Sequence, residues 1–131
     1  MPKNNLQEVF DRLKKIFTPY EKSMDVSRDT DEWYLLNTRH LLKKNYPLAF
    51  GGVHLGKNYV SVHILSFYYT PAQTKAISPE LKKRMQGKAC FNFKQVDEKL
   101  FKELAAITKA GAKRFNDKKF IDEMRKLHSK R

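Results

Sequence analysis

The sequence contains few residues of the kinds that define unusual folds. Of its 131 residues, one is cysteine, five are glycine and five are proline. The single cysteine, Cys90, cannot form an internal disulfide, which excludes a disulfide-rich secreted scaffold. The low glycine and proline content excludes collagen-like and low-complexity chains. The longest apolar stretch, at residues 60–69, is interrupted by polar residues and is far shorter than the ~20 residues of a membrane-spanning helix.

Acidic residues are also scarce, since 14 Asp and Glu stand against 27 Lys and Arg, for a formal net charge of +13. The rest of the composition is ordinary for a folded chain, with 40% hydrophobic residues, nine Phe, six Tyr and one Trp. A chain of this length buries roughly two-thirds of the surface that it exposes when unfolded. We therefore expect one domain over residues 1–131 that needs no disulfide, metal or cofactor.

The first ten residues, MPKNNLQEVF, are polar where a secretory signal peptide has a continuous apolar segment. A lone cysteine is also typical of reducing compartments. Both features favour a cytoplasmic protein with no membrane segment.

The first third of the sequence predicts a helix followed by a strand. Apolar residues recur at helical spacing over residues 6–20. At Pro19 this helix is expected either to kink or to restart, with Thr18 as the cap of the new turn. Residues 25–31 are polar and are interpreted as a loop. Residues 32–37 could form a short strand or a helical turn, and we favour the strand.

A β-hairpin is the clearest local prediction. Residues 48–55 and 59–68 are rich in β-forming residues and flank a Gly-Lys-Asn turn. We expect a register in which paired residue numbers sum to 115, because it sets apolar residues opposite one another, whereas a slip by one would oppose Val60 to a histidine. This register places two residues diagonally on the outer face, His54 and His63.

The second half predicts a short helix, a strand and a long helix. Ser78 is expected to cap a helix that runs through Met85 and ends at Gly87. Apolar and polar residues alternate over 88–93, which is typical of a half-buried strand. Asp97 is expected to cap a final helix whose apolar stripe continues toward the C-terminus as one bent helix or two.

This order of elements favours an α+β fold, in which an antiparallel sheet packs against N- and C-terminal helices. The same order disfavours a doubly wound fold, since strands do not alternate regularly with long helices. Gly51 and Gly52 lead into a strand rather than a helix, so we expect a bulge or a close helix approach there and no phosphate-binding loop.

Three stretches of the sequence are PLAFGGVHLGKNYVSVHIL, ISPELKKRMQGKACFNFK and LFKELAAITKAG. Taken together they resemble a known bacterial family, the YdhG-like proteins, a domain of unknown function. The resemblance covers about residues 29–111 and implies a frataxin-like fold, in which helices lie on one face of an antiparallel sheet. The basic helical extension, residues 112–131, lies outside it.

The resemblance also implies an alternative function, since one branch of the family is described as a frataxin-like iron chaperone. Frataxins hold iron on acidic residues along the first helix and first strand. In this sequence Glu8, Asp11 and Glu21 are interleaved with four cations, which oppose the approach of a hard metal ion. These cations are Arg12, Lys14, Lys15 and Lys22.

The excess positive charge lies mainly in the second half of the chain. Residues 1–74 carry 10 basic and 7 acidic residues, whereas residues 75–131 carry 17 and 7. Such a surface attracts phosphate backbones, although the competing interpretation is a solvated face that keeps the protein soluble. We expect a non-enzymatic module that binds a nucleic acid or an acidic protein. The predicted contact residues are Lys82, Lys83, Arg84, Lys88 and Lys94.

The remaining candidate sites are weaker. His54 and His63 are two metal ligands without the third that zinc or iron requires, so we expect no bound metal. An enzyme would need Cys90, a histidine and Asn92 in one pocket, an arrangement that side chains on separate faces would exclude.

The C-terminal apolar stripe must be buried. If the domain offers no groove for it, a homodimer is the natural cover. The stripe comprises Phe120, Ile121, Met124 and Leu127.

Overall fold

The computed structural model describes residues 2–43, 46–65, 73–87, 89–115 and 117–129. The helices are α1 Pro2–Phe17, with the 3-10 turn η1 Thr18–Tyr20, α3 Gln73–Ala76, α4 Pro79–Lys82, α5 Glu98–Arg114 and α6 Lys118–Ser129. The strands are β1 Asp25–Asp29, β2 Trp33–Lys43, β3 Tyr46–Leu55, β4 Val60–Ile64, β5 Met85–Gln86 and β6 Cys90–Phe93.

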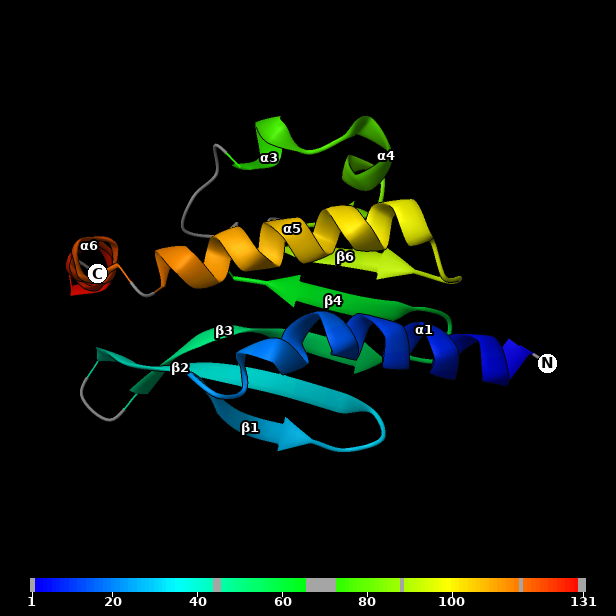
Figure 1. Ribbon diagram of the computed structural model, residues 1–131, viewed down its shortest axis with the longest axis horizontal. Helices are drawn as coiled ribbons and strands as arrows, with labels where there is room; N and C mark the ends of the chain where they lie inside the picture. The colour runs from blue at the N-terminus through cyan, green and yellow to red at the C-terminus, as the bar shows by residue number, and fades with distance from the viewer. Residues whose placement is uncertain (1, 44–45, 66–72, 88, 116, 130–131) are drawn as a thin grey trace.

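The strands form one antiparallel sheet in the order β1-β2-β3-β4-β6-β5. Helices α1 and α5 lie side by side on one face of it, which we call the inner face (Figure 1). The opposite side is called the outer face. The α+β prediction, with an antiparallel sheet packed against N- and C-terminal helices, is therefore confirmed.

The predicted hairpin register is also confirmed. Gly51 pairs with Ile64 and Leu55 with Val60, so that paired numbers sum to 115. Val60, Val62 and Ile64 are fully buried, since every second residue of β4 points to the inner face.

The core lies between the sheet and the two helices. Helix α1 contributes Val9, Phe10, Leu13 and Phe17, and α5 contributes Leu100 and Leu104. At its centre the Phe50 ring meets the rings of Phe17, Tyr20 and Phe115 edge-on, with centroids 6.1, 5.8 and 5.6 Å away. These contacts connect β3 to α1 and to the end of α5, which secures both helices on the inner face.

The glycine pair allows close approach, as expected. A Cβ on Gly51 would lie 2.3 Å from the His63 carbonyl oxygen and 3.1 Å from the Phe17 ring. A Cβ on Gly52 would lie 2.1 Å from the Tyr34 carbonyl oxygen. The pairing of β2 with β3 also shifts register beside this pair, which identifies a bulge.

Three local predictions were wrong in extent or type. Residues 25–29, expected as loop, form the edge strand β1, whose residues are all exposed and show no alternation. The helix capped by Ser78 ends at Lys82 rather than Met85, because Met85 and Gln86 pair with β6. The turn η1 begins after Phe17 rather than Thr18.

Other predictions agree more closely. Trp33 begins the strand expected from residue 32, and this strand continues to Lys43. The side chains of Ser78 and Asp97 accept hydrogen bonds from the Leu81 and Leu100 amides and so cap their helices. Residues 66–68 of the expected second hairpin strand lie outside the described residues.

The C-terminal stripe belongs to a separate helix, α6, which contacts β2. Ile121 is 2% exposed, and the Phe120 ring lies 5.6 Å from that of Phe115. Burial of Ile121 therefore needs no second copy of the chain. The side chains of Met124 and Leu127 lie outside the described part.

Among the described residues, no helix is long and apolar enough to cross a membrane.

Ile121→Ala should lower the free energy of unfolding by about 2–4 kcal/mol, since it removes a buried branched side chain and leaves a cavity. Urea unfolding followed by circular dichroism measures this change. Lys118→Ala, on an exposed position of the same helix, serves as the control. Equal stability of the two variants would mean that α6 does not pack on the domain.

Candidate nucleic-acid interface

A row of neighbouring residues crosses the outer face from β2 to the start of β5. Trp33 pairs with His54, His54 with Ser61, and Ser61 with Asn92. The Asn92 amide donates a hydrogen bond to the Arg84 carbonyl oxygen at 2.8 Å, which extends the row to the start of β5. Because directly paired residues point to the same side of a sheet, the four paired side chains share one face, and the Arg84 side chain lines a groove together with Asn92.

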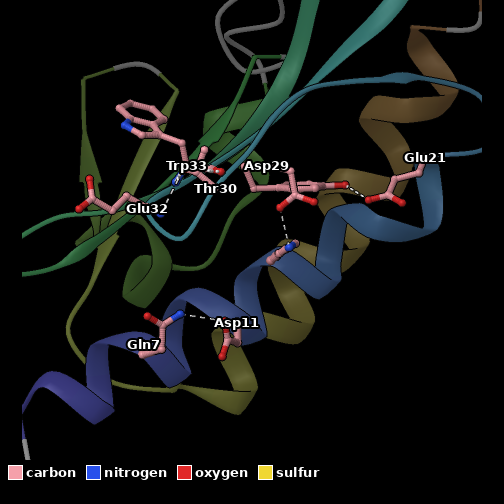
Figure 2. A network of polar contacts seen from close by, with 9 residues as sticks. Gln7, Asp11, Glu21, Asp29, Thr30, Glu32 and Trp33 are labelled. Atoms are coloured by element: carbon pink, nitrogen blue, oxygen red, sulfur yellow. Dashed lines mark hydrogen bonds and ion pairs between the residues drawn. The ribbon is translucent and has the colours of Figure 1, made fainter.

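Aromatic and cationic side chains stack at the β2 end of this row. The Trp33 and His54 rings are nearly parallel, with centroids 3.9 Å apart. The Arg28 guanidinium carbon lies 5.2 Å from the Trp33 ring centre. Thr30 fixes the turn that leads into β2, because its hydroxyl oxygen accepts hydrogen bonds from the amides of Glu32 and Trp33 (Figure 2). The result is a preformed stack of guanidinium, indole and imidazole.

Polar side chains in the middle of the row are held by one another. The Ser61 hydroxyl donates to the Asn92 side-chain oxygen at 2.7 Å. The Asn92 side-chain nitrogen donates to the Gln86 side-chain oxygen at 2.6 Å. This chain of hydrogen bonds orients two amide groups on the outer face, where amides can pair with the edges of nucleic-acid bases.

Three of the predicted basic residues meet at the β5 end of the row. Lys83, Arg84 and Lys94 line an open groove of about 330 Å³ together with Tyr59, Met85, Gln86 and Asn92. Lys82 is exposed at the end of α4 but does not line this groove, and Lys88 lies outside the described residues. Strands β3, β4, β5 and β6 contain no Asp or Glu. The groove therefore has a strongly positive border.

A second row on the same face brings Cys90 against His63. The Cys90 sulfur lies 2.9 Å from His63 Nδ1. Burial raises the pKa of the Cys90 thiol. Burial also lowers the pKa of His63, and the neighbouring His54 lowers it further. The pair is therefore a neutral thiol beside a neutral imidazole near pH 7.

Cys90, His63 and Asn92 lie on one face of the sheet. Side chains on separate faces would have excluded an enzymatic site, so the arrangement by itself does not exclude one. A nucleophilic cysteine, however, requires a thiolate, which a lowered pKa provides. The thiol pKa is shifted the opposite way here. This direction of the thiol pKa favours a packed pair over an activated nucleophile.

Among the residues that the structure describes, the histidines and acidic residues do not converge on a metal site. His54 is engaged in the stack on Trp33, and the described residues include no group of three or more His, Cys, Asp or Glu that could hold a metal ion. Figure 2 shows the carboxylates near the first helix directed to separate partners. Asp11 accepts from Gln7, Glu21 from the Tyr34 hydroxyl, and Asp29 from Lys14.

Sequence reasoning missed the stacking half of this face. Trp33, Arg28 and Tyr59 were not predicted as site residues. Alternation along residues 32–37 would assign Trp33 to one face of a strand, but only the pairing of β2 with β3 shows that it joins the face of His54 and Ser61. The alternation is visible in the sequence, but the strand register that assigns Trp33 to this face is not.

The chain matches no protein-family model, no curated protein and no solved structure. The YdhG-like resemblance therefore remains a prediction.

Cys90 in the folded protein should react with iodoacetamide more slowly at pH 7 than in the urea-unfolded chain, because only the thiolate reacts and burial raises the pKa of the thiol. An alkylation rate that is already maximal below pH 7 would instead indicate a thiolate–imidazolium pair.

The NMR titration midpoint of His63 should lie below about 6.5. His54→Gln should raise this midpoint, because it removes a nearby positive charge.

Proposed function

We propose that this protein is a non-enzymatic module that binds single-stranded nucleic acid on the outer face of its sheet. The observation that carries the proposal is the row from Arg84 to Trp33, because it joins a basic groove to an aromatic stack on one continuous surface. Cations contact phosphates, amides contact base edges, and aromatic rings stack on bases. These three kinds of group occur here in that spatial order.

A single strand suits this face better than a duplex. The row spans four steps between neighbouring strands, or about 19 Å, which accommodates a few nucleotides. Bases can stack on the Trp33–His54–Arg28 group only when they are unpaired and turned outward. In a duplex the bases are covered, so that only the contacts of Lys83, Arg84 and Lys94 with phosphates would remain.

The competing interpretation is a positive surface that only keeps the protein soluble. It predicts that all exposed cations contribute equally to any binding of nucleic acid. The proposal predicts that cations at the groove matter more than cations elsewhere, which gives the experiment its design.

The double variant K83E/R84E should weaken binding of a labelled single-stranded oligonucleotide by about tenfold or more in low salt, because it reverses two phosphate contacts. Fluorescence anisotropy over a salt series measures both affinity and its salt dependence. Three contacts predict a slope of log K against log salt of about −2, and the variant should lose roughly two-thirds of it.

The matched control is K118E/K119E, which changes the net charge by the same amount at two exposed positions of α6. It should weaken binding less than the groove variant does. Equal losses in the two variants would support the general surface-charge interpretation and contradict a site at the groove.

Trp33→Ala should weaken binding of the single strand by about 1–3 kcal/mol, the usual value for losing one base-stacking aromatic, and should leave duplex binding almost unchanged. Trp33→Tyr should retain most of the affinity. Because Trp33 is the only tryptophan, quenching of intrinsic fluorescence reports directly on contact at this end of the row. Binding without quenching, and without loss in Trp33→Ala, would confine the site to the groove.

A further inference from the structure

A second surface feature lies on the opposite side of the protein, where the two long helices run next to each other (Figure 1). A groove of about 500 Å³ opens between α1 and α5. It is lined from α1 and η1 by Arg12, Lys15, Ile16, Pro19 and Tyr20, and from α5 by Glu98, Phe101, Lys102, Ala105 and Lys109. None of these residues belongs to the outer face.

The floor of this groove is apolar. Ile16 and Tyr20 are half-buried and pack against the core, and Phe101 is almost fully buried. Pro19 and Ala105 are exposed. An apolar strip between two helices is the surface into which the apolar side of a third helix packs, through residues at i, i+3, i+4 and i+7.

The border of the groove is cationic. Lys15 lies on α1, and Lys102 and Lys109 lie two turns apart on α5, and all three are exposed. The carboxylate in the lining, Glu98, forms an ion pair with Arg12. Four cations therefore face one carboxylate that already has a partner, so the border favours an incoming ligand of negative charge.

We propose that this groove binds an acidic amphipathic helix of a partner protein. The apolar side of such a helix would cover Ile16, Tyr20 and Ala105, and its carboxylates would meet Lys15, Lys102 and Lys109. A nucleic acid would satisfy the cations but gains little from this floor, because Phe101 is almost fully buried and Ile16 and Ala105 carry no ring on which a base could stack. The inference does not rest on the proposed function, because it concerns the other side of the sheet.

The probe is a fluorescein-labelled synthetic peptide of 18 residues, with leucines at helical spacing on one side and glutamates on the other. Fluorescence anisotropy should show saturable binding to the full chain. A peptide of identical composition, scrambled so that its leucines do not align, should bind at least about tenfold more weakly, because it has the same charge but no apolar stripe.

Two variants test the location. K102E/K109E should weaken binding of the helical peptide by about tenfold or more, because two attractive contacts become repulsive. Ala105→Glu places a carboxylate on the exposed floor and should have a similar effect. The matched control, K99E/K113E, reverses two exposed lysines of the same helix that do not line the groove, and it should change the affinity less than threefold. Thermal unfolding of each variant confirms that it is folded.

Several results would overturn the inference. One is no saturable binding of the helical peptide, and another is equal binding of the scrambled peptide. A third is equal loss in K102E/K109E and K99E/K113E. Complete displacement of the peptide by a single-stranded oligonucleotide, accompanied by Trp33 quenching when the peptide binds, would place the peptide on the outer face instead. Simultaneous binding of peptide and oligonucleotide would support two separate surfaces.

Discussion

The pairing of Gly51–Leu55 with Val60–Ile64 decides which face every neighbouring side chain occupies. In this register Val53 and Val62 lie together on the inner face, and His54, Ser61 and His63 lie together on the outer face. A slip by one residue would expose the apolar set and bury the polar one. The core under α1 and α5 and the row across the outer face therefore depend on the same backbone hydrogen bonds.

Packing on the inner face leaves the outer face available for binding. Phe50 connects the sheet to α1 and to the end of α5 through three edge-on aromatic contacts, so the long helices gather on one side. Trp33, Ser61 and Asn92 remain only half-buried on the other. A sheet covered on one face is typical of antiparallel α+β domains, and its open face can carry polar and aromatic groups without loss of the core.

Part of the positive charge of the chain borders two surfaces of different chemistry. Lys83, Arg84 and Lys94 border a groove that continues into amides and aromatic rings. Lys102 and Lys109 border a groove with an apolar floor. The two proposed ligands therefore differ, because the groups between the cations differ. Net charge alone would not distinguish these surfaces.

The sequence by itself determined the features that depend on near neighbours. The hairpin register follows from alternation on both sides of a short turn, and the caps at Ser78 and Asp97 follow from side chains that reach amides three residues away. The tertiary structure decided what depends on distant pairing. It made β1 a strand and ended α4 at Lys82, since β2 and β6 supply the partners. It also brought Arg84 and Trp33, 51 residues apart, into one row, because cross-strand neighbours arise from sheet order, which local propensity does not specify.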